Sequence, residues 1–199
     1  MTCARILRAL RSEQGAATVE LVIIAPFLMV FIGTFVTIWD AFRTANLSLY
    51  ASYTVADHLS RERHVITDEK IEELGDLLAF LVPTSGETAV RVTVLERKLD
   101  EFDEPYTHWV ESWSTNPSVV PATTTTAEVA DHIPILALGN RIYITETYTD
   151  WEPFYGPDIL PGRMIHHVAA TPPRFASPPT QAEKDARDAA SENPDVDGV

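Results

Sequence analysis

A glycine and a glutamate five residues apart introduce a long apolar run in this 199-residue chain. Gly15 is followed by Ala16-Ala-Thr-Val-Glu20, and the uncharged run Leu21 to Trp39 begins at the next residue. A cut after Gly15 would give Ala16 a free α-amino group, which is largely protonated at neutral pH. Glycine suits such a cut because it lets a protease approach the backbone closely. These residues predict a processing site at Gly15 and Ala16.

Glu20 is the single carboxylate that immediately precedes the apolar run. An unpaired charge is costly in a membrane, and pairing with an opposite charge offsets that cost. In helices packed side by side, Glu20 can pair with the Ala16 amino group of an adjacent subunit and so fix the stagger between subunits. The alternative is that Glu20 only marks the cytoplasmic end of the span, within reach of water.

The other residues that could take part in catalysis or metal binding match no known site motif. The six histidines include no His-x-x-x-His or His-Glu-x-x-His spacing, so we expect no metal site. The sequence has no Gly-x-Ser-x-Gly elbow and no glycine-rich phosphate loop, and its one cysteine is Cys3. Glu146 could be a buried functional acid, but we expect it on the wet face of an edge strand. We therefore predict no catalytic residue, no enzyme activity, no cofactor and no small-molecule substrate.

The element that positions Glu20 is long enough to cross a bilayer. A membrane helix needs about 20 mostly apolar residues, and Leu21 to Trp39 has only Thr34 and Thr37 as polar side chains. We predict a transmembrane helix over 16–40. The alternative is a cleaved secretory signal, whose apolar stretch is usually shorter and ends at small residues.

Two helix breakers and an aromatic residue fit a membrane span. Pro26 and Gly33 are tolerated in membrane helices because neighbouring groups satisfy the freed carbonyl, and Pro26 predicts a bend. Trp39, followed by charged residues, is typical of the interfacial end of a span.

Charge sets the expected orientation. Residues 1–15 carry three arginines against one glutamate, which predicts a cytoplasmic leader. Residues 41–175 then form an extracytoplasmic stalk and head. The whole chain has a formal net charge of −14, and such an acidic balance argues against binding nucleic acid.

Beyond the span, the sequence predicts an α+β head. Helical spacing continues to about His64, and a second helix follows with Thr67 as its N-cap and Pro83 past its end. Alternation of apolar and polar residues then predicts a small antiparallel sheet of three strands, packed on the helices, at 90–95, 108–113 and 142–149. We expect a loop over 117–139, which contains the threonine tract 123–126, and a disordered acidic tail over 176–199.

The start of the apolar helix, residues 15–26, reads Gly15-Ala-Ala-Thr-Val-Glu20-Leu-Val-Ile-Ile-Ala-Pro26. It resembles the opening of TadE/TadG-like pilus assembly proteins, which reads Gly-x-x-x-Val-Glu-Phe-Ala-x-x-x-Pro. The strands at 90–95 and 109–114 and the stretch Asn140 to Tyr148 look similar too, so the resemblance covers about Gly15 to Phe175. Leu21 departs from the aromatic residue usual in the family. The chain is too short for the large TadG proteins and lacks an Asp-x-Ser-x-Ser motif, so a TadE-like protein is the better match.

This resemblance implies a minor pilin or pseudopilin of the tight-adherence system, which builds Flp-type pili. It further implies a pilin-like fold, cleavage after Gly15 by a prepilin peptidase, and other pilus assembly or pilin subunits as partners. The chain would then be a single-pass protein of the bacterial inner membrane with its C-terminal domain in the periplasm. The alternative is a membrane-anchored periplasmic accessory or sensor domain that is neither processed nor incorporated into a fibre.

Overall fold

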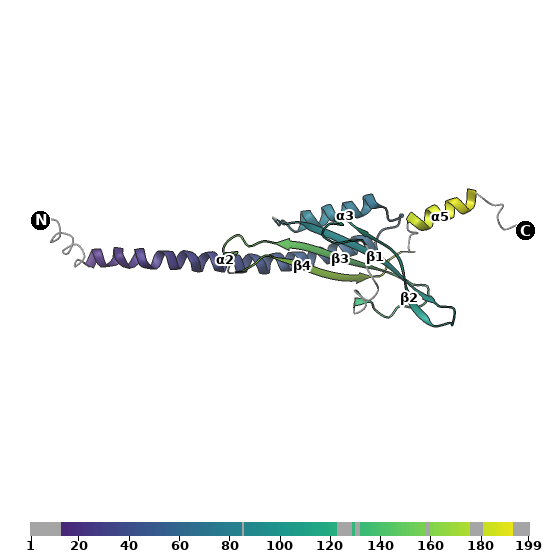
Figure 1. Cartoon of the computed structure of the whole chain (residues 1–199), viewed down its shortest axis with the longest axis horizontal. Helices are drawn as coiled ribbons and strands as arrows, with labels where there is room; N and C mark the ends of the chain where they lie inside the picture. The colour runs from purple at the N-terminus through teal and green to yellow at the C-terminus, as the bar shows by residue number, and fades with distance from the viewer. Residues whose placement is uncertain are drawn as a thin grey trace, which may run out of the picture. The chain divides into compact units, whose positions relative to one another are not determined.

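The computed structural model describes residues 13–84, 86–122, 129, 132–157, 160–175 and 181–192. In chain order, the elements are α2 (Glu13–Ser60), α3 (Asp68–Leu81), β1 (Thr88–Leu99), β2 (Pro105–Ser114), β3 (Arg141–Trp151), β4 (Arg163–Thr171) and α5 (Gln181–Glu192) (Figure 1). The chain divides into two compact units. One holds α2 up to Arg43 together with Pro153–Pro161, and the other holds Thr44–Glu152 and the chain from Gly162 onward.

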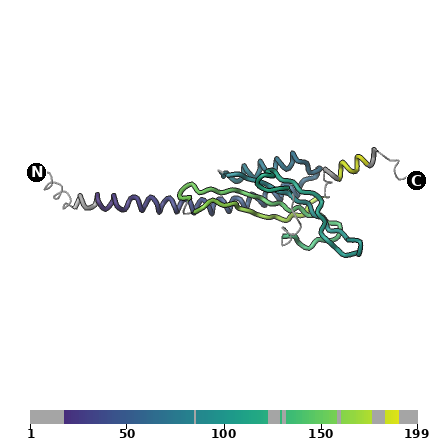
Figure 2. The backbone as a smooth tube through the Cα atoms, viewed as in Figure 1, coloured from purple at the N-terminus to yellow at the C-terminus, as the bar shows by residue number. Residues whose placement is uncertain are grey.

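The first unit contains the apolar part of α2, a helix of 48 residues with Pro26 inside it. Four successive side chains, Leu21 to Ile24, are 48–69% exposed. Successive helical residues point about 100° apart, so this turn of the helix is apolar and exposed on every side. It is long and apolar enough to cross a membrane. The turn between β3 and β4 also belongs to this unit and lies beside α2 (Figure 2).

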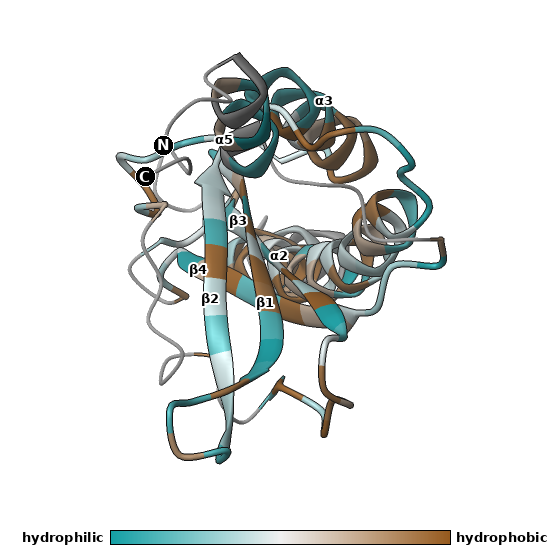
Figure 3. Cartoon of the chain, turned by 90° about the vertical axis from the view of Figure 1, so that its right-hand side faces the viewer, coloured by the Kyte–Doolittle hydropathy of each residue, from teal (hydrophilic) through white to brown (hydrophobic). Residues whose placement is uncertain are grey.

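In the second unit, α3 and the later part of α2 pack on one face of the sheet (Figure 3). Thr67 is the N-cap of α3, as predicted, and its hydroxyl accepts a hydrogen bond from the Lys70 N–H at 3.3 Å. The core on this face joins side chains of α2, α3 and the strands: Ala51, Val55, Leu59, Ile71, Leu74, Leu78, Val90, Val92, Val94, Trp113 and Tyr143.

The sheet has four antiparallel strands in the order β2-β1-β3-β4. The α+β class with an antiparallel sheet is confirmed, but the prediction of three strands is wrong. β4 was missed because its adjacent His166-His167 and Ala169-Ala170 pairs break the alternation, and alanine has a low strand propensity. Pairing with β3 along its whole length stabilises it instead.

The second face of the sheet is covered as well. Leu95, Ile142 and Ile144 form a separate core there with Val129, and Ile133 and Leu136 pack against it. The described residues of 117–139, which were predicted as a loop, therefore form a covering segment on this face. The threonine tract lies outside the described residues.

The C-terminal segment differs from its prediction of disorder, because residues 181–192 form α5. This stretch is rich in alanine, glutamate, lysine and arginine, which are strong helix formers. Glu183 also accepts a hydrogen bond from Arg141 Nη1 at 2.9 Å. Residues 176–180 and 193–199, like residues 1–12 of the leader, lie outside the described residues.

Candidate functional site

The residues predicted to be processed lie at the start of α2. Gly15, Ala16 and Glu20 all fall within its first turns. Ala16 and Glu20 are four positions apart in the sequence, which is about one turn of an α-helix. Glu20 is exposed. Its pairing with Ala16 of an adjacent subunit needs a second copy and stays a prediction.

The predicted span residues differ in their surroundings. Leu21 and Trp39 are 66% and 59% exposed, and Pro26 is exposed too. Gly33 is different, because a Cβ built on it would lie 2.7 Å from the ring of Tyr155. Glycine at this position therefore permits a close approach between helix and turn.

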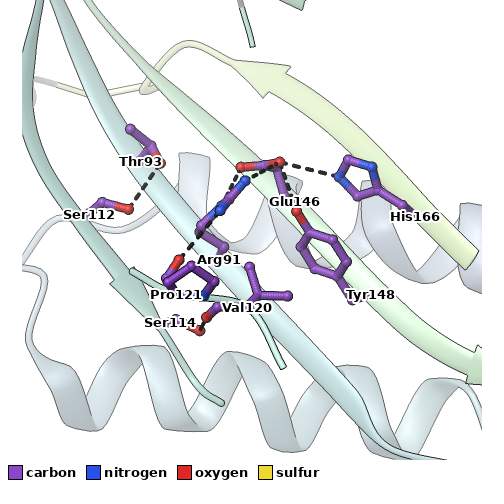
Figure 4. A network of polar contacts seen from close by, with 9 residues as sticks. All are labelled: Arg91, Thr93, Ser112, Ser114, Val120, Pro121, Glu146, Tyr148 and His166. Atoms are coloured by element: carbon purple, nitrogen blue, oxygen red, sulfur yellow. Dashed lines mark hydrogen bonds and ion pairs between the residues drawn. The ribbon is translucent and has the colours of Figure 1, made fainter. Parts of the chain in front are cut away.

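The second unit, which is the head, contains a buried ion pair between its two central strands, β1 and β3. Arg91 of β1 and Glu146 of β3 lie directly opposite each other in the strand register. Arg91 Nε donates to Glu146 Oε2 at 2.7 Å, and Nη2 donates to Oε1 at 2.8 Å (Figure 4). Their side chains are only 7% and 2% exposed. Two parallel charge-assisted bonds give this pair both strength and a fixed geometry.

Further groups complete the network around this pair. Tyr148 donates its hydroxyl to Glu146 Oε1 at 3.0 Å, and His166 Nε2 lies 3.2 Å from the same oxygen. The rings of Tyr148 and His166 are stacked, with their centroids 4.4 Å apart. Arg91 Nη1 donates to the carbonyl of Pro121 at 3.3 Å. The covering segment thus contributes to the network as well as to the core.

Glu146 is held in its charged form. Burial raises its pKa, but hydrogen bonds from His166, Arg91 and Tyr148 and the charge of Arg91 outweigh burial and lower the pKa to about 2. A general acid or base works best with a pKa near the operating pH. Glu146 therefore suits a fixed structural charge and not proton transfer at neutral pH.

The position of Glu146 corrects the expectation that it lies on the wet face of an edge strand. β3 is an inner strand, and Pro121, Val129, Ile133 and Leu136 lie on the face of the sheet on which Glu146 lies. Arg91 was missed altogether. Arg91 is the single charged residue in 88–95 of β1 and Glu146 the single charged residue in 142–149 of β3, and these opposite charges were the available signal for the pair.

The adjacent histidines of β4 make contacts on opposite faces of the sheet. His166 contacts Glu146, whereas His167 forms a hydrogen bond with the backbone of Ala45 in α2. Burial lowers the pKa of His167, so its neutral form is favoured. Across the described residues, no group of three or more His, Cys, Asp or Glu side chains could hold a metal ion.

Comparisons of the chain with protein-family models, curated proteins and solved structures found no match. A functional proposal for this chain therefore depends on its own residues and geometry.

Proposed function

We propose that this chain is a membrane-anchored minor pilin or pseudopilin that takes part in the assembly of Flp-type, tight-adherence pili. Its role is structural and not catalytic. The proposal places it in the bacterial inner membrane as a single-pass protein, with residues 1–15 in the cytoplasm and the C-terminal domain in the periplasm.

One observation carries this proposal: α2 has two different environments along its length. Around Leu21 to Ile24 its apolar side chains are uncovered on every side, whereas Ala51, Val55 and Leu59 belong to the core of the head. The uncovered part suits a bilayer, and it also suits packing against the same part of other subunits. A subunit that is held in a membrane and then assembled through its N-terminal helix needs both environments.

The start of α2 agrees with this role. The stretch Gly15 to Pro26 carries the resemblance to TadE-like proteins, and a prepilin peptidase would act at the Gly15–Ala16 bond. That bond lies within α2, near its start. Glycine is a poor helix former, so the first turn can open there at little cost and present the peptide to a protease.

The mature N-terminus tests the proposal. Mass spectrometry of the protein purified from membranes should show Ala16 as its first residue. A Gly15→Leu variant should retain the leader, because the added side chain hinders close approach to the backbone, and Ala17→Ser serves as the control that is still cut. An intact Met1 or Thr2 in the unmodified protein would contradict processing and favour the accessory or sensor function. Fractionation then separates the two functions further, since a pilus subunit should appear among sheared fibres.

A further inference from the structure

The turn between β3 and β4, Pro153–Pro161, shares a compact unit with the apolar part of α2. The hydroxyl of Thr37 donates to the backbone carbonyl of Tyr155 at 3.1 Å, and it also lies 3.0 Å from the carbonyl of Gly33. The ring of Tyr155 covers Gly33 so closely that a Cβ would clash with it. The turn is therefore held on the span and not only on the strands that it connects.

The level of this contact along α2 is set by the length of a membrane span. A span of about 20 residues ends near Phe35 if it begins at Ala16, and near Asp40 if it begins at Leu21. Gly33 and Thr37 lie seven and three positions before Asp40. At the rise of an α-helix this is about 10 and 5 Å below it. With the first boundary the turn contacts α2 at the end of the hydrocarbon core, and with the second boundary it contacts α2 about 5–10 Å inside that end.

The composition of the turn fits that level. Phe154 is 80% exposed, and Tyr155 belongs to the residue types that concentrate at membrane interfaces. Three of the nine residues are proline and have no N–H to desolvate, and the N–H of Leu160 bonds to the carbonyl of Gly156 at 3.0 Å. Asp158 is the only charged residue in the turn, so no basic side chain is present to bind anionic headgroups.

We propose that the Pro153–Pro161 turn is a membrane-interface loop, which inserts Phe154 among lipids at the boundary of headgroups and acyl chains. This inference rests on the proposed membrane anchor. Its partner is the lipid bilayer itself, bound through aromatic and apolar contact. The loop thereby gives the head a second membrane attachment beside the span.

Fluorescence quenching of the full chain in vesicles of phosphatidylethanolamine and phosphatidylglycerol tests this loop. A Cys3→Ser background allows a single environment-sensitive label at Phe154→Cys, with matched labels at Phe102→Cys and Phe31→Cys. Phe102 is 83% exposed in the turn between β1 and β2, and Phe31 is 68% exposed in the span. We expect a nitroxide placed near the headgroup of a lipid to quench the label at position 154. Iodide in the water should quench that label several-fold less than the label at position 102.

The outcomes separate the loop from the anchor. If a nitroxide on the lipid acyl chains quenches the label at position 31 while position 154 is as open to iodide as position 102, the loop proposal fails and the anchor stands. If the nitroxide on the acyl chains does not quench the label at position 31, both proposals fail. Protection of position 154 from both quenchers would overturn the lipid partner in favour of a protein surface, such as a second copy.

A second variant tests the contact that holds the loop. Gly33→Leu fills the space beneath Tyr155 and should raise iodide quenching at position 154, because the displaced turn leaves the interface. Met29→Leu introduces the same side chain one turn away at a 74% exposed position and should have no effect. Equal quenching in the two variants would contradict the proposed contact.

Discussion

At the scale of single residues, the Arg91–Glu146 pair stabilises the head only while both charges are present. Both hydrogen bonds from the Arg91 guanidinium to the Glu146 carboxylate are buried between the sheet and its covering segment. Neutralising one partner leaves the other charge buried without compensation, and this typically costs about 3–5 kcal/mol. We therefore expect Glu146→Gln to lower the free energy of unfolding by about 3–5 kcal/mol. Urea unfolding of the full chain in detergent micelles, followed by tryptophan fluorescence, measures this change.

The matched control for this change is Glu73→Gln. Glu73 pairs with Lys70 at 2.8 Å, but its side chain is 60% exposed. Exposed ion pairs contribute about 0–1 kcal/mol, so the control should change the free energy of unfolding by no more than this. Similar losses in the two variants would mean that the buried pair has no special stabilising role.

Glu20 gives a second prediction at this scale. Glu20→Ala should reduce pilus yield while leaving membrane insertion intact, because removal of a charge eases insertion and removes the proposed partner of the Ala16 amino group. Asp40→Ala is the control, since Asp40 lies at the other end of the span and pairs with Arg43 of its own helix. Fibre yield and membrane content of both variants are the measurements. Unchanged yield in Glu20→Ala would leave Glu20 as a boundary residue only.

At the scale of the elements, α3 depends on its N-cap. The Thr67 hydroxyl satisfies the N–H of Lys70, one of the four N–H groups that a helix start leaves without partners. Thr67→Ala should lower the free energy of unfolding by about 1 kcal/mol. Thr54→Ala is the control, because Thr54 is an exposed residue inside α2 whose hydroxyl bonds to the carbonyl of Tyr50. A loss in Thr54→Ala as large as in Thr67→Ala would show that the cap has no particular effect.

The elements also show what sequence patterns can and cannot predict here. Sequence patterns located α3 correctly because its start and its buried face are set by local signals. These signals are the N-cap Thr67 and the helical spacing of Ile71, Leu74 and Leu78. Alternation found β1, β2 and β3, although each is longer than predicted. β4 and the burial of Glu146 were missed for a shared reason. Both depend on contacts between distant segments: β4 on its pairing with β3, and the burial of Glu146 on the cover that Pro121, Val129, Ile133 and Leu136 supply.

At the scale of the whole molecule, two carboxylates of the described residues contribute to the response to acid, because the pKa of each is strongly lowered. Hydrogen bonds and the Arg91 charge outweigh burial at Glu146. At Glu62, burial is likewise outweighed by hydrogen bonds from the backbone of His64 and Arg63 and from the side chains of His64 and Lys70. Each pKa falls from 4.5 to about 2. The unfolded chain therefore binds more protons than the folded chain within this interval, and stability falls as the pH drops through it.

This reasoning gives a pH prediction. The urea midpoint of the full chain should be lower at about pH 3 than at about pH 7, and Glu146→Gln should show a smaller difference between the two because one of the two titrating carboxylates is removed. Urea unfolding at both pH values measures the effect. An equal loss in the variant and the unmodified chain would place the acid response elsewhere.

The order of the strands also bears on how the head folds. β1 with β2, and β3 with β4, are pairs of neighbours along the chain, whereas β1 and β3 are separated by the whole of β2 and the covering segment. Closing a long loop costs more entropy than closing a short one, so the two hairpins should form before they join. Arg91 and Glu146 face each other across that one distant pairing. A shift of one residue would move one charge to the opposite face of the sheet, so the ion pair admits a single alignment when the two hairpins meet.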